Sequence, residues 1–540
     1  MGAYWLQSLL ALCVVATLGG CGYSSPPNPT TKAFRINLGT EPPTLDPARA
    51  TDLTSFTVLQ AIQKGLVELD NHMNPVPAVA KRWQRSSDGK HYMFWLNPHA
   101  RWHDGAPVTA QQFVDGWCRA LNPTTGSEYA FFLHAIAGAQ RFSAGNNHQL
   151  QTCYGLLQAK PLGAHQLSIT LTKPLPFFLH LLASPVALPI RLSQLTASPN
   201  PFTTPQNLPS NGPFVLTHWQ HDNRIRLEPN PHYWLTKAQT PIEMMMVPDA
   251  NTSLALYETN QLDLIETTTS LPSVDVRRLR HHPDAHQLPL YRLNYLGLNH
   301  RRGPLTQARV RQALALALNK PWIAQLLQGG QQPLNGLIPP GLAGYSPHVG
   351  LAYNPQKARA LLALAGYPQG KGFPPLTLAY RSGFDTRREM EIIQYQWQHQ
   401  LGIRVHLQAM DWKMYLQQLQ TDPPDVYALG WFADYPDPDT FTSLFTTTNG
   451  NNYSHWHHPA YDEGVAQAAT LPNGPKRFAL LLRLQQLLLE EDVAIIPLHS
   501  AQKTYLVKPW VKGLHISPMN LMALQHITLT VPTPVNASPP

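Results

Sequence analysis

The sequence has few charged side chains for its length, and its basic residues do not cluster. Asp, Glu, Lys and Arg make up 13% of the 540 residues, with a formal net charge of +8 at pH 7, whereas about 25% is typical of soluble proteins. No run of Lys and Arg, alone or interleaved with aromatic residues, marks a surface for nucleic acid. We therefore expect no nucleic-acid partner.

Short motifs of the common catalytic and cofactor sites are also missing. The sequence contains no HExxH, GxSxG, CxxC or GxGxxG. The glycine-rich segment 366–372 is too short for a phosphate loop and has Gly372 where a Ser or Thr would hold magnesium. Two histidine clusters, at 281–282 and 455–458, are not in helical register with a carboxylate or a cysteine, so we expect them to be surface residues. The sequence therefore predicts neither an enzyme nor a bound metal or cofactor.

The one prominent apolar run lies at the amino terminus, where Leu9 to Leu18 are followed by Gly19, Gly20 and Cys21. This order is typical of a lipoprotein cleavage site. We predict a signal peptide over residues 1–20 and lipid on the Cys21 thiol, with the start of an ordinary buried helix as the alternative.

The remaining chain is expected to work outside the cytoplasm while its lipid holds it on a membrane. Residues 21–33 are rich in Ser and Pro and suit a flexible tether, so folding should begin near Phe34. No later stretch has the ~20 apolar residues that a spanning helix needs.

Four cysteines are few, and two of them belong to the amino terminus. Cys13 would leave with the signal peptide and Cys21 would carry lipid, so Cys118 and Cys153 remain. An even pair in an oxidising compartment suits a disulfide. Two buried, unpaired thiols are the alternative.

Two helices are predicted from the residues at their ends. After a turn at Asp104-Gly105, Thr109 and Gln112 have the spacing of a capping box. The apolar face that follows consists of Phe113, Val114, Trp117 and Leu121. Asn354 and Pro355 begin a second helix of about three turns, which Gly366 ends.

The segment from Leu376 to Trp431 alternates between strand and helix patterns. The predicted strands cover Leu376–Tyr380, Ile403–Gln408 and Val426–Trp431, with helices that start at a Thr386/Glu389 capping box and near Trp412. Such a βαβαβ unit has parallel strands and binds ligands beyond their carboxyl ends. Trp412 and the segment 430–434 lie at these ends, and a carboxylate beside tryptophans suits a cationic ligand.

Five segments of the sequence resemble, in the same order, the oligopeptide-binding branch of the large solute-binding proteins of ABC transporters. They are Glu41-Pro-Pro-Thr-Leu-Asp46-Pro47, Trp102-His-Asp-Gly-Ala-Pro-Val-Thr-Ala110, Arg309-Val-Arg-Gln-Ala-Leu314, Trp431-Phe-Ala-Asp434-Tyr-Pro-Asp-Pro438 and Leu506-Val-Lys-Pro-Trp-Val511. The resemblance extends from about Phe34 to Thr530.

The resemblance implies an α/β class protein with the two-lobed, hinged fold of periplasmic binding proteins and an additional inserted α/β subdomain. We expect lobe I to be discontinuous, over residues 34–64, 196–290 and 505–532. The inserted subdomain is expected over residues 65–195 and lobe II over 291–504, with a tail at 533–540.

The resemblance also implies where a peptide would bind. Asp434 matches the carboxylate that pairs with the α-ammonium group of the peptide, and Gly430 and Trp431, with the adjoining Phe432 and Ala433, match the segment that hydrogen-bonds its main chain. Trp412 and Tyr129 match positions that line the cavity. Basic positions that relatives use for the ligand carboxylate fall on Leu419 and Ala428, and an acidic position near the amino end falls on Thr51. How the far end of the ligand is held is therefore left open, with longer peptides, a modified or amidated carboxyl end, or another cationic ligand as the alternatives.

We therefore expect a monomeric, lipid-anchored receptor outside the cytoplasm that captures peptides and delivers them to an ABC permease. Two alternatives remain open. The same fold could bind another solute, such as a cell-wall peptide, a nickel chelate, haem or an opine. The chain could also be a sensory or envelope interaction lipoprotein with a degenerate cavity.

Overall fold

The structure is a computed structural model that describes residues 33–197, 202–203, 205, 208–267, 271 and 275–530. The predicted signal peptide, Cys21, the tether up to residue 32 and the tail 533–540 lie outside the described residues. The first described strand, β1 (Phe34–Asn37), begins where folding was predicted to begin. None of the helices in the described part of the chain combines the length and apolar character needed to cross a bilayer.

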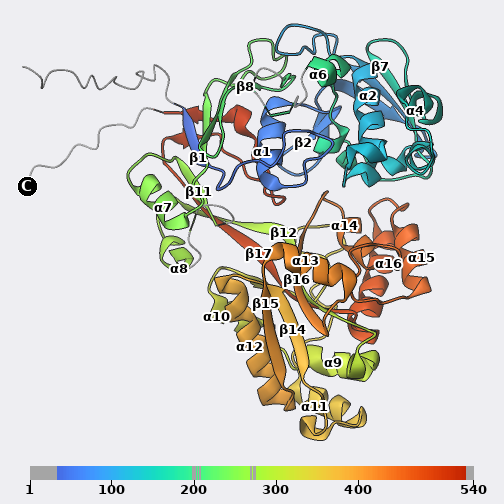
Figure 1. The fold of residues 1–540 in the computed structure, drawn as a ribbon, viewed down its shortest axis with the longest axis vertical. Coiled ribbons are helices and arrows are strands. Elements are labelled where there is room, and N and C mark those ends of the chain that lie inside the picture. Colours follow the sequence, from blue (N-terminus) through green and yellow to red (C-terminus); the bar gives the residue numbers. More distant parts are fainter. Residues whose placement is uncertain are drawn as a thin grey trace, which may run out of the picture. The chain divides into compact units, whose positions relative to one another are not determined.

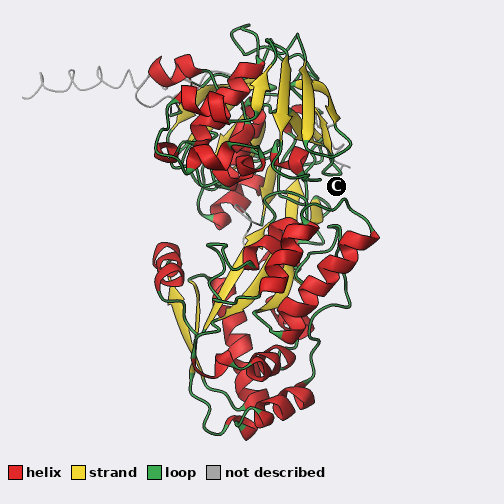
Figure 2. Ribbon diagram, turned by 90° about the vertical axis from the view of Figure 1, so that its right-hand side faces the viewer, coloured by secondary structure: helices red, strands yellow, loops and turns green. Residues whose placement is uncertain are grey.

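One sheet of eleven strands runs through much of the described chain. In spatial order its main path is β15 (Val405–Met410), β14 (Leu376–Arg381), β16 (Val426–Phe432), β12 (Ala285–Leu298), β17 (Ile495–Val507), β11 (Leu264–Glu266), β1, β10 (Ile242–Met245), β9 (Arg224–Pro229) and β8 (Phe214–Gln220), and β13 (Gln332–Pro333) pairs with β17. Both parallel and antiparallel pairs occur. Figure 2 shows helices packed alongside these strands.

The long strands β12 and β17 lie side by side within this sheet (Figure 1). They have 14 and 13 residues and pair in antiparallel register, with an irregularity between Pro289 and Leu293. The predicted boundaries between lobes I and II, at 290/291 and 504/505, fall inside these two strands. Because a bulge lets paired strands bend locally, this strand pair suits a hinge; the boundaries themselves stay predictions.

The region predicted as an inserted subdomain has a sheet and a core of its own. Its sheet order is β4 (Ala80–Arg85), β5 (His91–Leu96), β7 (Gln166–Thr170) and β6 (Ala159–Pro161). The core joins this sheet to α2 (Ala110–Leu121), α3 (Ala139–Ser143), α4 (Leu150–Leu156) and α5 (Phe178–Leu181), and it includes the fully buried Trp102 and Trp117.

Cys118 on α2 and Cys153 on α4 form a disulfide whose Cα atoms are 5.8 Å apart. Of the two alternatives that the sequence left open, the structure therefore contains the bridge. The bridge ties together two helices of the same core.

The two helices predicted from their end signals are confirmed. In α2, Gln112 Oε1 accepts from the backbone N–H of Thr109 at 3.0 Å, as a capping box requires, and the predicted apolar face is buried. In α11 (Pro355–Leu364), the side chain of Asn354 accepts from the N–H of Lys357. Gly366 follows that helix with φ of +96°, a left-handed conformation that glycine adopts without strain.

The βαβαβ unit is confirmed, with one correction. β14, α12 (Phe384–Leu401), β15, α13 (Trp412–Thr421) and β16 follow in the predicted order, and β14 pairs in parallel with both β15 and β16. The predicted cap at Thr386 was wrong, because α12 begins at Phe384 and the N–H of Arg387 already donates to the carbonyl of Gly383 at 2.9 Å. Thr386 therefore lies inside the first turn.

The other regular elements complete this framework. The remaining helices are α1 (Leu53–Ile62), α6 (Leu192–Ala197), α7 (Ala250–Glu258), α8 (Val276–Leu279), α9 (Ala308–Leu316), α10 (Lys320–Leu327), α14 (Asp439–Thr442), α15 (Pro459–Ala468) and α16 (Pro475–Gln486). Two short hairpin-like pairs join β2 (Val67–Leu69) to β3 (Pro75–Pro77) and β18 (Val511–Lys512) to β19 (Thr528–Leu529).

Candidate ligand-binding site

A cavity of about 270 Å³ brings together segments that are far apart in the sequence. Its walls come from residues 50–73, from the predicted insert at 129–132 and 180–188, from residues 432–435 at the end of β16, and from 515–525. Four of the predicted ligand residues line it: Tyr129, Phe432, Ala433 and Asp434. Thr51, where relatives were expected to carry an acidic residue, also lines it.

Asp434 is the carboxylate of this cavity that lies just beyond the end of β16. Its Oδ1 accepts a hydrogen bond from the hydroxyl of Tyr129 at 2.9 Å, and its backbone N–H donates to Thr440 Oγ1 at 3.1 Å. It forms no salt bridge with any Lys, Arg or His in the described part of the chain. The cavity therefore holds a carboxylate with hydrogen-bond donors but without an ion-pair partner among the described side chains.

Burial raises the pKa of Asp434 to about 6, although nearby donors on Tyr129, Trp431 and Thr440 favour the charged form. Burial and the neighbouring carboxylate raise the pKa of the Tyr129 hydroxyl, so that hydroxyl stays protonated and donates. A cation that enters the cavity would favour the charged form of Asp434 further. The arrangement suits a ligand with a positively charged end.

The edge of β16 next to the cavity is open on one side. In the described part of the chain, β14 pairs with β16 only at Leu378/Val426 and Ala379/Tyr427, so the later residues of β16 have no strand partner on that side. The carbonyl of Ala428 points to this side, since it accepts from Tyr415 at 2.8 Å, and the N–H of Ala433 points to the opposite side, toward Tyr291 on β12.

Alternation along a strand decides which main-chain groups face the open edge. Because successive residues direct their N–H and C=O groups to opposite sides, Gly430 and Phe432 share the side of Ala428. Their main-chain groups therefore face away from β12. An extended ligand could add there as another strand.

The other predicted ligand residues lie beside the cavity and do not form its wall. Trp431 is half-buried and packs against a hydrophobic core beside the cavity. Its Nε1 has no hydrogen bond of good geometry among the described residues, although the indole is close enough to favour the charged form of Asp434. Trp412, at the start of α13, is 45% exposed, and the Arg381 guanidinium lies 5.5 Å from the centre of its ring. The roles of Trp412, Trp431 and Gly430 in binding stay predictions.

Gly430 has a packing role that the sequence did not reveal. A Cβ on this residue would lie 2.7 Å from Oδ1 of Asn294 and 2.9 Å from a terminal nitrogen of Arg292. Both side chains come from β12, which pairs with β16 at this level. A larger residue here would therefore require these two polar side chains to shift.

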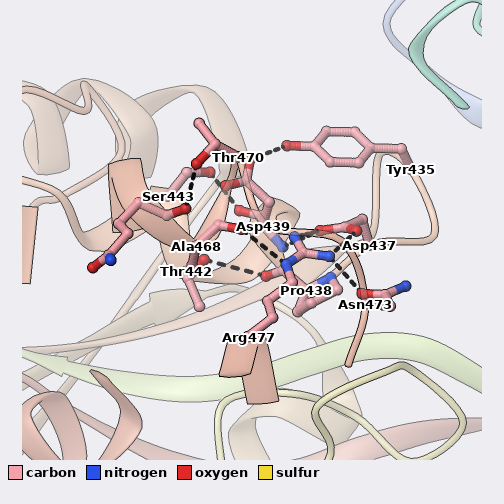
Figure 3. A network of polar contacts seen from close by, with 11 residues as sticks. Tyr435, Asp437, Pro438, Asp439, Thr442, Ser443, Ala468, Thr470, Asn473 and Arg477 are labelled. Carbon is pink, nitrogen blue, oxygen red and sulfur yellow. Dashed lines mark hydrogen bonds and ion pairs between the residues drawn. The ribbon is translucent and has the colours of Figure 1, made fainter. Parts of the chain in front are cut away.

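A buried polar network supports the segment that follows Asp434 (Figure 3). Arg477 on α16 donates to both carboxylate oxygens of Asp437, at 2.7 and 2.6 Å, and both side chains are almost fully buried. The hydroxyl of Tyr435 donates to Asp439 at 2.8 Å. Burial and the adjacent Asp437 raise the pKa of Asp439 to about 6.

Tyr435 joins this network to the region predicted as the insert. Its ring stacks on Phe177 with the centres 5.1 Å apart and meets Phe132 edge-on at 5.5 Å. Sequence reasoning included Tyr435 and Asp437 in a motif but did not identify these contacts. The partners Phe177 and Arg477 are distant in sequence and carry no local signal.

The predicted histidine clusters do not form a metal site in the described residues, where no group of three or more His, Cys, Asp and Glu side chains has suitable geometry. His281, His282, His455, His457 and His458 are not among the residues of the cavity wall. His180 and His515 do line the cavity, and burial lowers the pKa of both, which favours their neutral forms.

Comparison with known proteins agrees with the fold and the motifs. The chain is 32% identical over 488 residues to the periplasmic murein peptide-binding protein MppA of Escherichia coli, covering 88% of this chain and 89% of that protein. It is 31% identical over 494 residues to the periplasmic oligopeptide-binding protein OppA of the same organism, covering 88% of each. The solved structure of an oligopeptide-binding protein of Borrelia burgdorferi superimposes with a TM-score of 0.80 at 27% identity, covering 92% of this chain and all of that one.

Residues 74–453 match the family described as bacterial extracellular solute-binding proteins, family 5. The predicted resemblance and the predicted two-lobed α/β fold class are thereby confirmed. Members of this family are binding proteins, and the chain belongs to the bacterial extracellular solute-binding proteins of family 5.

Proposed function

We propose that this chain captures peptides outside the cytoplasm and delivers them to the permease of an ABC transporter. The observation that carries the proposal is Asp434, a buried carboxylate in the cavity that has hydrogen-bond donors but no counter-charge among the described residues. The α-ammonium group of a peptide supplies that charge, and a charge-assisted hydrogen bond is about twice as strong as a neutral one.

The open edge of β16 supports a peptide in preference to a small cation. The main-chain groups of Gly430 and Phe432 face an unpaired side of the strand, where a peptide backbone can pair without regard to its side chains. An amine at Asp434 would then continue into an extended chain along β16. The relatives MppA and OppA, by their names, bind murein peptides and oligopeptides.

Calorimetric titration with one peptide in two forms tests this assignment. Asp434→Asn should weaken binding of the free-amine peptide at least ~100-fold, since leaving one member of a desolvated charge pair costs about 3 to 5 kcal/mol. The same peptide with an acetylated amino end should bind the parent weakly and lose little more in the variant, because the missing interaction is the same one.

A matched control replaces an exposed carboxylate. Asp422→Asn, which breaks a surface pair with Arg302, should leave the affinity of both peptide forms unchanged. If the affinity lost on acetylation and the affinity lost in Asp434→Asn simply add, this carboxylate does not hold the amine. Native mass spectrometry of the protein purified without refolding identifies the retained solute, and a metal chelate, haem or opine in place of peptides would overturn the peptide assignment.

The proposed function includes a lipid anchor at Cys21. Cys21→Ser should abolish incorporation of a labelled fatty acid, because a hydroxyl cannot form the thioether to the lipid. Cys13→Ser is the matched control and should be labelled like the parent. Equal labelling of the Cys21 variant and the parent would show that the anchor is elsewhere.

A further inference from the structure

Arg292 and Arg381 are two arginines beside the ligand site without an ion-pair partner in the described part of the chain. Arg292 projects from β12 over the face of β16, and its guanidinium lies 4.6 Å from the centre of the Phe432 ring. Its Nε is buried and has no hydrogen-bond partner among the residues that the structure describes. Neither guanidinium forms a salt bridge with a described carboxylate.

The surroundings of Arg292 leave its charge only partly balanced. Burial lowers the pKa of Arg292 and the nearby Arg381 adds to that shift, whereas the Glu389 carboxylate opposes it. Glu389 is itself engaged, because its Oε1 contacts Nε2 of His499 at 2.9 Å. A partly buried cation without a direct partner is costly, and an incoming anion would reduce that cost.

Arg381 stands at the position where an extended ligand on β16 would meet the neighbouring strand. It is the last residue of β14, which separates from β16 beyond the Ala379/Tyr427 pair. Its guanidinium lies over the exposed ring of Trp412, which holds it at the carboxyl ends of the parallel strands. Ligands of parallel sheets bind at those ends.

The spacing between Arg292 and Asp434 limits the length of a peptide that could join them. Arg292 pairs in register with Phe432 and its side chain lies over Gly430, which precedes Asp434 by four residues. β16 ends at Phe432, two residues before Asp434, so these four residues span at most ~13 Å. An extended peptide of up to about four residues fits within that limit.

We propose that Arg292 and Arg381 form the subsite for the terminal carboxylate of a short peptide whose amino end is held at Asp434. This subsite replaces the basic positions expected at Leu419 and Ala428. The inference rests on the proposed peptide-binding function and gives that function a length preference. Trp412 acts as a positioning residue, since it supports the Arg381 guanidinium and need not touch the ligand.

A titration series with trialanine as free acid and as carboxyl amide tests the subsite. In Arg292→Gln and in Arg381→Gln, affinity for the free acid should fall ~10-fold or more, whereas affinity for the amide should change little, because the amide lacks the charge that the arginines bind. Arg359→Gln, an exposed position on α11, is the matched control and should leave both affinities unchanged.

The outcomes separate this inference from the proposed function. Equal losses for acid and amide in both arginine variants, with unaltered circular dichroism and melting temperature, would overturn the subsite while the Asp434 experiment still supports peptide binding. If the parent binds neither form, both the subsite and the proposed function are overturned. The same holds if no free-amine peptide depends on Asp434 for its affinity. Peptide length gives a further readout. The part of the affinity that is lost in Arg292→Gln and Arg381→Gln should be no larger for hexaalanine than for trialanine.

Discussion

The hydroxyl of Tyr129 donates a hydrogen bond to Oδ1 of Asp434 at 2.9 Å, across a separation of 305 residues in the sequence. Tyr129 belongs to the region predicted as the insert, and Asp434 follows β16 in the region predicted as lobe II. The bond stabilises the charged form of a carboxylate whose pKa burial raises. The contact between these two regions and the protonation state of Asp434 are therefore linked.

Peptide affinity should depend on pH through Asp434. The pKa of Asp434 is about 6 without ligand, and a bound ammonium group would lower it, so binding expels a proton below that pH. Affinity should be constant near pH 7 and fall as the pH drops below about 6, by up to tenfold per pH unit. Titrations between pH 4.5 and 7.5 measure this pH dependence of the affinity. In Asp434→Asn the fall in affinity at low pH should be absent.

In Tyr129→Phe the fall in peptide affinity at low pH should begin at a higher pH. The substitution keeps the aromatic ring but removes the donor that favours the carboxylate, so the pKa of Asp434 should rise further. A net loss of about 0.5 to 1.5 kcal/mol corresponds to a ~2- to 10-fold weaker affinity near neutral pH. Superimposable pH profiles for the parent and the variant would show that the bond does not persist in solution.

Local signals explain how much of the fold the sequence predicted. The helix ends at Thr109 and Asn354 and the alternation from β14 to β16 depend on neighbours within a few residues, which a sequence displays directly. The start of α12 was predicted three residues late because the chain enters that helix through extended Gly383, so the Thr386 side chain is not needed as a cap.

Contacts between distant segments explain what the sequence did not predict. Arg477 is 40 residues from its partner Asp437, and no local pattern connects them. Arg292 and Gly430 are brought together only because β12 pairs with β16 in this register. Asp434 could be singled out because the resemblance carried it, whereas the surrounding charges depend on side chains that the motif does not include.

Removing the disulfide should destabilise the region around α2 without altering the site. The bridge closes a loop of 35 residues, for which chain entropy predicts a loss of about 4 kcal/mol in Cys118→Ser/Cys153→Ser. The melting temperature of this region should fall, while peptide affinity should be unchanged because the bridge lies outside the cavity wall. Alkylation of the unfolded, unreduced parent followed by peptide mapping should find neither Cys118 nor Cys153 modified; modification of both would contradict the bridge.

The buried pair of Asp437 and Arg477 should matter far more for stability than an exposed pair. Asp437→Asn leaves the guanidinium buried without its counter-charge, which costs about 3 to 5 kcal/mol in chemical denaturation. Glu491→Gln removes the carboxylate from the exposed pair with Arg483 and is the matched control, with little change expected. Similar effects in the two variants would mean that the Asp437 pair is open to solvent.

Tyr435 should stabilise the contact between the segment after β16 and the region around Phe177. Tyr435→Ala removes a stacked contact on Phe177 and an edge contact on Phe132, each worth about 0.5 to 1.5 kcal/mol beyond the buried area. Since these contacts exist only when the two regions meet, their loss should shift the equilibrium toward an open state and weaken peptide binding ~10-fold or more. Tyr435→Phe keeps the stacking and should lose less.

Small-angle scattering distinguishes a role of Tyr435 in closure from a purely local role in packing. In the parent, saturating peptide should reduce the radius of gyration, and in Tyr435→Ala the reduction should be smaller at the same fractional saturation. Tyr395→Ala, an exposed tyrosine on α12, is the matched control and should behave like the parent. If Tyr435→Ala closes as fully as the parent and only melts at a lower temperature, the aromatic contacts stabilise the folded chain but do not govern closure.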